Sequence, residues 1–281
     1  MRIRIVLAPV TEPSFLPLDQ HPLAALIYRT VALVAPDYAE FLHEEGYLSP
    51  RSRDNSTPGE AHKTFKFFTF SRPYLPDTLL NKGRDERVWF ARGAVTWQVS
   101  SPLPEFMKAL TAGLMTQQVV TIGDSRGQAQ FAVESIEEVL PPPMLTELRC
   151  KTLSPLTVSV AETDPNGLRR KQFIRADDLR FGALVKANLE EKYRVLLGAE
   201  PDGAIRFAFD EEYIRRRGGV DKISKLAQYK GTKIKAWQAP FTVTGDPALI
   251  RLGWECGFGE ANSKGFGMVE PAPLRDRGER L

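Results

Sequence analysis

The chain has 281 residues, 42% of them hydrophobic and 26% charged, which suits one large or two small globular domains with apolar cores. Its apolar runs are too short for a signal peptide or for the ~20 residues of a membrane span. Cys150 and Cys256 are far apart in sequence and form no metal-ligand pattern, so we expect two reduced thiols in a cytoplasmic protein. A formal net charge of +3 does not demonstrate nucleic-acid binding, but it allows a local basic patch.

The first half of the chain predicts a β-α-β-β-α-β order. Arg2 to Ala8 begins by alternating polar and apolar residues, as a half-buried strand does, and Pro22 opens an apolar-faced helix. A second short helix runs from Tyr38 to Glu45 and is closed by Gly46. Residues 49–62 are polar and rich in helix breakers, which predicts a mobile loop. The remaining predicted elements are strands over Lys66–Ser71, Arg87–Phe90 and Ala94–Ser100, a helix over Pro104–Met115, and strands over Gln118–Ile122 and Gln130–Val139.

The second half repeats this order after a stiff connector, Pro141-Pro142-Pro143. We therefore expect an α+β protein of two tandem ferredoxin-like domains, residues 1–140 and 145–281. Its predicted elements are strands within Leu148–Val160, a helix over Asp177–Val195, strands over Ile205–Phe209 and within Lys233–Thr244, a helix over Asp246–Glu255, and a strand over Phe266–Val269. The charged tail from Pro271 to Leu281 predicts a frayed end.

A glycine-rich stretch, Gly257-Phe-Gly-Glu-Ala-Asn-Ser-Lys-Gly-Phe-Gly267, lies between the last predicted helix and the last predicted strand. A bare backbone can approach a ligand closely, so we interpret the stretch as a loop whose N–H groups face phosphate oxygens. A dinucleotide fingerprint needs the opposite order, strand before helix, and the P-loop pattern is missing. The loop therefore predicts phosphate-backbone recognition rather than nucleotide-dependent chemistry.

A window from Tyr213 to Lys235 carries eight basic residues opposed only by Asp221. Such a charge run is often a solvated face, but its pairing with the glycine-rich loop favours a track for a phosphate backbone. The basic residues of the window are Arg215, Arg216, Arg217, Lys222, Lys225, Lys230, Lys233 and Lys235. Together with Arg29, Lys264 and the loop glycines Gly257, Gly259, Gly265 and Gly267, they are the predicted RNA-binding residues.

The glycine-rich loop resembles the signature of the CRISPR-associated repeat-processing endoribonucleases, the "Cas six" branch of the repeat-associated mysterious protein superfamily. Further segments resemble family landmarks in the family order, so the resemblance runs from about residue 1 to 270. These landmarks are Leu26-Ile27-Tyr28, Tyr38-Ala-Glu-Phe-Leu-His43, Lys66-Phe-Phe-Thr-Phe-Ser71 and Leu153-Ser154-Pro155. The family carries tandem ferredoxin-like domains, which agrees with the order of the predicted elements.

The resemblance implies cleavage of precursor CRISPR RNA within each repeat, without a metal or other cofactor, for antiviral defence. The ribose 2′-OH would attack the adjacent phosphorus and leave a 2′,3′-cyclic phosphate, or the 3′-phosphate reached from it, and a 5′-OH. The family's catalytic positions fall on Tyr28, His43 and Lys66, with Lys63 as the alternative lysine. Imidazole exchanges protons near neutral pH, so His43 suits a general acid. Tyr28 would act as base or orient the 2′-OH or phosphate, and Lys66 would stabilise the phosphorane.

His21 and His62 are interpreted as non-catalytic, since His21 precedes Pro22 at a helix N-terminus and His62 lies in the polar loop. The implied partner is CRISPR repeat RNA, as precursor and as processed guide. Other subunits of a CRISPR effector complex are further candidate partners, and both monomer and homodimer stay open. Two alternatives remain: a non-catalytic repeat-RNA holder of the same fold, and a nucleotide-dependent enzyme that uses the glycine-rich loop.

Overall fold

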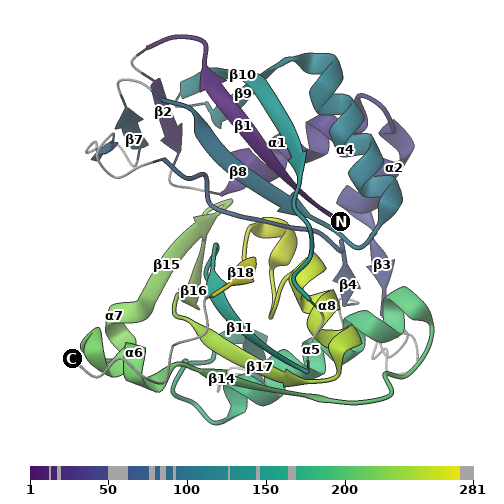
Figure 1. Cartoon of the computed structure of the whole chain (residues 1–281), viewed down its shortest axis with the longest axis vertical. Helices are drawn as coiled ribbons and strands as arrows, with labels where there is room; N and C mark the ends of the chain where they lie inside the picture. Colours follow the sequence, from purple (N-terminus) through teal and green to yellow (C-terminus); the bar gives the residue numbers. More distant parts are fainter. Residues whose placement is uncertain are drawn as a thin grey trace.

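The computed structural model describes most of the chain, and Figure 1 shows its arrangement as two β-sheets with helices. The described residues are 1–12, 14–17, 20–49, 63–75, 80–82, 87–90, 93–125, 127–143, 146–163 and 169–272. The predicted loop over residues 49–62, His62 included, and the predicted frayed tail lie almost wholly outside these ranges. Within the described ranges, no helix is long and apolar enough to cross a membrane.

The first half of the chain builds a five-stranded antiparallel sheet in the order β5-β8-β1-β10-β9. Two strands follow the last helix of this half: β9 comes first and lies at the edge of the sheet, and β10 then pairs with the first strand, β1. The β5–β8 pair lies on the other side of β1. This arrangement is the ferredoxin-like one with an added edge strand, β9. The strands are β1 (Arg2–Pro9), β5 (Thr69–Phe70), β8 (Val95–Ser100), β9 (Val119–Asp124) and β10 (Gly127–Glu138).

Three helices accompany this sheet: α1 (His21–Ala32), α2 (Pro36–Glu44) and α4 (Pro104–Gln117). Each has a proline in its first two positions, where the missing N–H costs nothing. Two small sheets complete the half, β2-β7-β6 and β3-β4. Their strands are β2 (Ser14–Pro17), β6 (Leu80–Lys82), β7 (Arg87–Phe90), β3 (Tyr47–Leu48) and β4 (Thr64–Phe65).

The second half repeats the topology in a four-stranded antiparallel sheet of order β14-β17-β11-β18. Here the strand after the last helix, β18, pairs with the first strand of the half, β11. The strands are β11 (Glu147–Thr152), β14 (Ile205–Phe209), β17 (Phe241–Gly245) and β18 (Val269–Pro271), and the helices are α5 (Arg180–Leu197) and α8 (Pro247–Cys256). The α+β class and the repeated ferredoxin-like order are therefore confirmed, while the domain boundary at residues 140–145 stays a prediction.

Two hairpins are inserted into this second half. One is β12 (Ser159–Thr163) with β13 (Arg169–Phe173), and the other is β15 (Ser224–Tyr229) with β16 (Thr232–Trp237). Two short helices, α6 (Glu211–Arg216) and α7 (Val220–Ile223), precede β15. In Figure 1 the β15–β16 hairpin rises from the lower half toward the upper one. A 3-10 turn, η2 (Asn262–Lys264), lies inside the glycine-rich loop.

The segment Phe65 to Phe70 divides its side chains between two hydrophobic cores. Phe68 and Phe70 belong to the core of the first half, whereas Phe65 and Phe67 belong to the core of the second. The predicted continuous strand over Lys66–Ser71 is therefore wrong in extent, because Phe67 takes a φ of +51° that interrupts the strand between β4 and β5. The predicted strand over Phe266–Val269 likewise begins only at Val269, since Gly267 has a φ of +78°.

Arg2 joins the two halves from the first strand. Its side chain is 1% exposed and donates to the carbonyl oxygens of Val269 and Trp254, each at 2.6 Å. The guanidinium also lies 4.0 Å from the centroid of the Trp254 ring. Burial lowers the pKa of Arg2, but an arginine stays charged at neutral pH. Two carbonyl oxygens and the Trp254 ring therefore hold a buried cation, whose Nε has no hydrogen-bond partner among the described residues.

We expect Arg2→Met to lower the free energy of unfolding by about 3 kcal/mol, because it leaves two buried carbonyl groups without a donor. Arg4→Met is the matched control on the same strand: Arg4 is 45% exposed and pairs with Glu137 at 3.6 Å, which predicts a change within about 0.5 kcal/mol. Denaturant unfolding measures both. Equal losses for the two variants would contradict a special role for Arg2.

Candidate functional site

The three predicted catalytic residues converge from three segments of the first half. Tyr28 lies on α1 and His43 near the end of α2, and their ring centroids are 5.4 Å apart at an interplanar angle of 87°. Lys66 follows β4, and its Nζ donates to the backbone carbonyl of His43 at 3.2 Å. Lys66 is thus the lysine that contacts His43. Lys63 instead lies with its amine 5.3 Å from the Phe65 ring centroid.

Gly46 makes room for Lys66 at the end of α2. Its φ is +70°, and a Cβ there would lie 2.8 Å from Cδ and 2.9 Å from Nζ of Lys66. The N–H of Gly46 donates to the Phe41 carbonyl at 2.7 Å, which closes the helix as the sequence predicted. The same glycine therefore ends α2 behind His43 and admits the lysine amine to that helix end.

Burial acts in opposite directions on two of these groups. It raises the pKa of Tyr28, with a smaller contribution from Tyr229, so the phenol keeps its proton at neutral pH. Burial lowers the pKa of Lys66, and Glu44 and Glu45 oppose that effect. In these protonation states the Tyr28 hydroxyl can donate a hydrogen bond, and Lys66 carries a positive charge.

Glu44 is a neighbour of the site that our reading of the sequence missed. Its Oε1 lies 2.6 Å from His43 Nδ1, a hydrogen bond on the surface of the protein. If Nδ1 donates to the carboxylate, Nε2 is the ring atom that stays available to a substrate. The adjacency of the two residues in sequence was visible, but only the rotamers show that they meet.

The glycine-rich loop is buried rather than open. All four of its glycines are buried, with φ between +72° and +87°. The N–H groups of Gly257, Gly265 and Gly267 donate to the carbonyl oxygens of Gly253, Asn262 and Pro155. The expectation that these three glycines present their N–H groups to phosphate is therefore wrong, because those groups are already paired inside the protein.

Lys192, on α5, holds the loop from within. The side chain is 2% exposed, and its Nζ donates to the Gly257 carbonyl at 2.8 Å and to the Gly259 carbonyl at 3.0 Å. It also donates to Oδ1 of Asn262 at 2.7 Å. Burial lowers the pKa of Lys192 to about 8, and the three acceptors compensate for the loss of water. Nothing in the residue pattern of α5 had singled this lysine out.

The other side of the loop packs against the first half of the chain. A Cβ at Gly265 would lie 2.5 Å from Oε1 of Gln20 and 2.6 Å from the Phe70 ring. The Thr69 hydroxyl donates to the Phe266 carbonyl at 3.0 Å. The loop is thus a joint between the halves, and Gly265 leaves room for the Gln20 and Phe70 side chains of the first half.

A cavity of about 580 Å³ opens beside this joint, between the Lys63–Phe68 segment, the β12–β13 hairpin, α5 and the loop. Five lysines line it, and the carboxylate among its lining residues is that of Glu260, which accepts hydrogen bonds from the backbone and hydroxyl of Ser159. The lining lysines are Lys63, Lys66, Lys171, Lys192 and Lys264. This excess of positive charge next to His43 suits a polyanion. Across the described part of the chain, no group of three or more His, Cys, Asp or Glu is placed to hold a metal ion.

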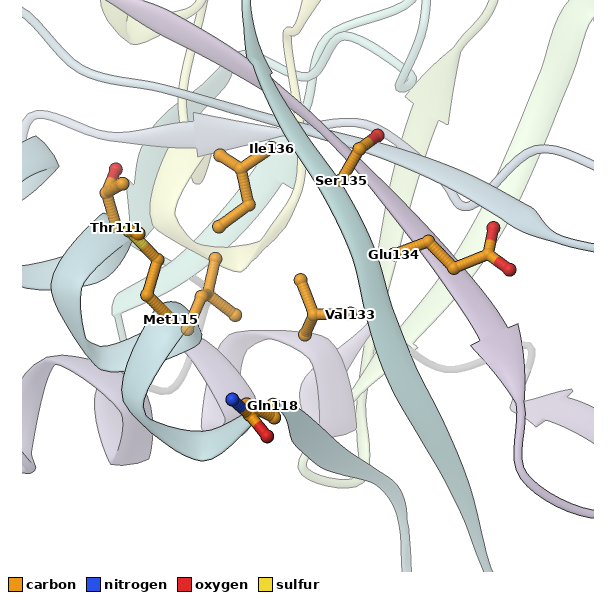
Figure 2. A pocket seen from close by; sticks show the side chains of 8 residues that line it. Thr111, Met115, Gln118, Val133, Glu134, Ser135 and Ile136 are labelled. Carbon is orange, nitrogen blue, oxygen red and sulfur yellow. The ribbon is translucent and has the colours of Figure 1, made fainter.

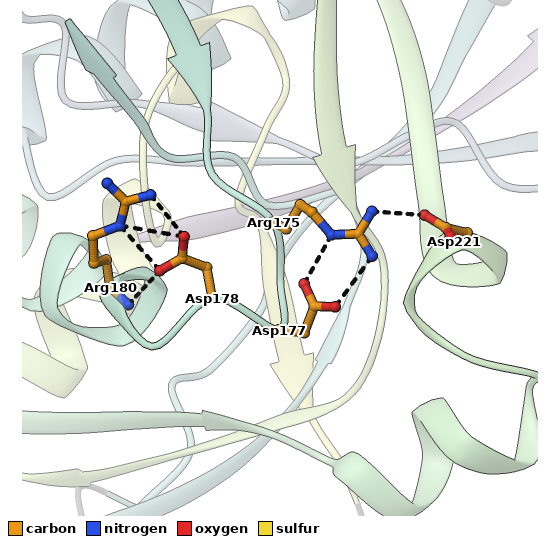
Figure 3. Close-up of polar contacts among 5 residues, drawn as sticks. All are labelled: Arg175, Asp177, Asp178, Arg180 and Asp221. Atoms are coloured by element: carbon orange, nitrogen blue, oxygen red, sulfur yellow. Dashed lines mark hydrogen bonds and ion pairs between the residues drawn. The ribbon is translucent and has the colours of Figure 1, made fainter. Parts of the chain in front are cut away.

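The basic window does not form one continuous track. Lys233 and Lys235 face the same side of the β15–β16 hairpin as their cross-strand partners Gln228 and Leu226, whereas Lys225 pairs with Ala236 on the opposite side. Arg215, Arg216 and Arg217 lie at the end of α6, before the hairpin. Asp221, the only acid of the window, pairs at 2.9 Å with Arg175 outside it (Figure 3). The single track expected from the sequence is therefore wrong, because strand alternation splits it.

Two other features lie apart from the site. The Arg29 guanidinium donates to the Thr121 carbonyl at 2.9 Å, so it ties α1 to β9 and is not brought to the lysine-lined cavity. A separate cavity of about 360 Å³ lies between α4 and β10, where Met115 and Thr111 face Val133 and Ile136 (Figure 2). Its lining offers no cation, so an anionic ligand has nothing to pair with there.

Comparison with known proteins gives this geometry a context. Residues 140–271 match the family model described as "CRISPR associated protein Cas6, C-terminal". The CRISPR-associated endoribonuclease Cas6 1 of Methanocaldococcus jannaschii is 28% identical over 250 residues, which cover 89% of this chain and 84% of that protein. A solved structure of a CRISPR associated protein Cas6 superposes with a TM-score of 0.72 at 27% identity, covering 97% of this chain and 99% of that one. The chain is therefore similar to Cas6 proteins over most of its length.

A further Cas6 relative, the CRISPR-associated endoribonuclease of Pyrococcus furiosus, is 26% identical over 251 residues, which cover 89% of this chain and 81% of that protein. The Cas6 similarity therefore extends over both halves, including the first half that carries Tyr28, His43 and Lys66. The resemblance inferred from the glycine-rich loop and the ordered landmarks is confirmed.

We expect Gly265→Ala to destabilise this Cas6 fold by about 3 kcal/mol, since the new Cβ meets Gln20 and Phe70 at a φ that alanine disfavours. Gly231→Ala separates the effect of the backbone conformation from that of the steric contacts. Gly231 has a φ of +78° but nothing within 4 Å of a Cβ, so we expect its free energy of unfolding to fall by about 1 kcal/mol. Urea unfolding of both variants measures the difference. A loss at Gly265 no larger than at Gly231 would argue against the joint.

Lys192→Met should remove about 3 kcal/mol or more from the free energy of unfolding, because three buried acceptors lose their donor. Lys186→Met, on the same helix, is the control: Lys186 is 42% exposed and pairs with Glu190 at 3.7 Å, so we expect a change within about 0.5 kcal/mol. Thermal or urea unfolding reports both values. If the Lys192 variant is as stable as the control, the lysine does not hold the loop.

Proposed function

We propose that this chain is a metal-independent endoribonuclease that cleaves precursor CRISPR RNA within each repeat, for CRISPR antiviral defence. The observation that carries the proposal is the convergence of Tyr28, His43 and Lys66 at the edge of a lysine-lined cavity, in a chain similar to Cas6 proteins. The named endoribonucleases among its relatives support the reaction class.

The proposed reaction is an internal transesterification. The 2′-oxygen of the nucleotide before the cleaved bond attacks the adjacent phosphorus, the bond from phosphorus to the 5′-oxygen breaks, and the 2′-OH proton leaves to a base. The products are a 2′,3′-cyclic phosphate, or the 3′-phosphate reached from it by hydrolysis, and a 5′-OH. No electron acceptor or metal is needed, because the chemistry requires an acid, a base and positive charge for the phosphorane.

His43 is the proposed general acid. With Nδ1 bonded to the Glu44 carboxylate, a protonated ring presents Nε2–H to the leaving 5′-oxygen and transfers that proton as the bond breaks. The ring lies at the last turn of α2. Glu44 would orient the ring in the way that a carboxylate orients the histidine of a triad.

Tyr28 and Lys66 are proposed to position and stabilise. The neutral Tyr28 hydroxyl donates a hydrogen bond to the 2′-oxygen or to a phosphate oxygen, since burial keeps its proton in place. The Lys66 ammonium lies at the end of α2 on the His43 carbonyl, and it would pair with the charge that develops on the phosphorane. Neither group accepts the 2′-OH proton in its neutral-pH form, so that proton is proposed to pass to solvent water.

The remaining lysines of the cavity are proposed to bind the RNA backbone, with Lys264 extending this surface from the glycine-rich loop. The loop itself contributes by holding the two halves of the chain in a fixed relative position. Of the predicted RNA-binding residues, Lys230 and Lys264 lie together, and the arginines of α6 would contact RNA only beyond the cavity.

His43→Ala should reduce the single-turnover cleavage of repeat RNA in EDTA by about 10²- to 10⁴-fold, the usual contribution of a general acid. Affinity for an RNA with a 2′-deoxy nucleotide at the cleavage position should change little, because His43 is 53% exposed and its ring contact with Tyr28 is edge-on. Cleavage that survives unchanged in the variant rules out His43 as the acid. A wild-type protein that binds the repeat but never cuts it, with no gain on adding divalent metal, is the RNA holder instead.

A further inference from the structure

Tyr229, at the tip of the β15–β16 hairpin, meets the first half of the chain close to the proposed catalytic cluster. Its ring centroid lies 5.3 Å from that of His21, with an interplanar angle of 89°. His21 and Tyr28 are seven residues apart on α1, so they share one face of that helix. Tyr229 also contributes to the raised pKa of Tyr28, after burial. An aromatic side chain of the second half therefore stands beside the proposed cleavage site.

Lys264 lies beside this tyrosine, and lysines of two other segments lie near Lys264. Lys171 comes from β13, Lys230 from the hairpin turn and Lys264 from the glycine-rich loop, where its Nζ lies 5.1 Å from the Tyr229 ring centroid. Burial, and then the charges of Lys171 and Lys230, lower the pKa of Lys264, so these cations repel one another across a short distance. The carboxylate of Glu260 pairs with Lys171 at 3.4 Å and is shared with Ser159.

Like charges that are held together favour an anion that relieves their repulsion. Phosphate oxygens on lysines, next to an aromatic ring on which a base can stack, are the features of a site for single-stranded nucleic acid. Lys171 and Lys264 line the same cavity as Lys66, which lies on the His43 carbonyl. A nucleotide held here would thus be an immediate neighbour of the bond that is cut.

We propose that the hairpin tip and these lysines form a subsite for one unpaired nucleotide next to the scissile bond. Its phosphate would lie on Lys171, Lys230 and Lys264, and its base would stack on Tyr229. The subsite rests on the proposed function, but it makes a separate claim, which is that residues of the second half recognise one nucleotide. Two of these residues, Tyr229 and Lys171, belong to no motif that the sequence analysis identified. His21 supports the Tyr229 ring and is a positioning residue.

Stacking is tested with RNA of the repeat sequence from the source genome, with a 2′-deoxy nucleotide at the cleavage position and one abasic residue at each neighbouring position in turn. At one position, the missing base should weaken binding by wild type about tenfold and should not weaken binding by Tyr229→Leu any further. Tyr229→Phe, which keeps the ring, should bind like wild type. If the effects of Tyr229→Leu and of the abasic residue multiply at every position, Tyr229 only packs the joint and the stacking claim is wrong.

The phosphate contact is tested by the salt dependence of binding. Lys171→Met and Lys264→Met should each reduce the slope of log affinity against log salt by about 0.7, the value for one phosphate of a single strand. Lys151→Met is the control, since Lys151 is 64% exposed and pairs with Glu270 at 3.1 Å, much as the 71% exposed Lys171 pairs with Glu260. Unchanged slopes for both cavity variants would overturn the phosphate site.

Failure of the subsite can be told apart from failure of the proposed function. Cleavage of the all-ribose repeat by wild type tests the function alone. If wild type cleaves while the Tyr229 and lysine variants behave like the Lys151 control, the function stands and the subsite is wrong. If wild type neither binds nor cleaves the repeat, the proposed function is wrong and the subsite with it.

Discussion

The buried ammonium of Lys192 is the interaction on which the geometry of the site depends. It donates hydrogen bonds to two backbone carbonyls and to the Asn262 side chain in the glycine-rich loop, and it has almost no access to water. A charge in such a place is tolerated only when its hydrogen bonds are made, so the loop has little freedom to take another path. The loop in turn brings Lys264 to the cavity and Gly265 against Gln20 and Phe70.

Side chains of each half contact the other half, and the proposed site is built from residues of both. Arg2 of the first strand reaches carbonyls of the second half, and the phenylalanines of the Phe65–Phe70 segment enter both cores. The proposed catalytic residues come from α1, α2 and the segment after β4, whereas Tyr229 and Lys264 come from the hairpin and loop of the second half. A change at the joint should therefore act on chemistry and on RNA binding together, by moving one set against the other.

Several features of this arrangement were predictable because they are local. Proline and glycine positions located α1, α4 and the end of α2, and the Asp246 cap of α8 is present, with its carboxylate accepting from the Ala248 N–H at 2.8 Å. The repeated order of strands and helices indicated tandem ferredoxin-like units, and both sheets have that topology. Tyr28, His43 and Lys66 came from the family resemblance, and the fold does bring them together. Their catalytic roles stay a proposal.

The sequence by itself indicated the class of fold, the approximate extent of the longer helices and the resemblance to the family, because these follow from periodicity, capping residues and a recurring motif. Only the tertiary structure decided what the glycine-rich loop does. Its composition is equally suited to an open anion cradle and to a tight joint, and the choice depends on which partners its N–H groups find. The division of the basic window likewise follows from strand register, and the link of Tyr229 to α1 joins residues some 200 positions apart in the chain, which no local pattern encodes.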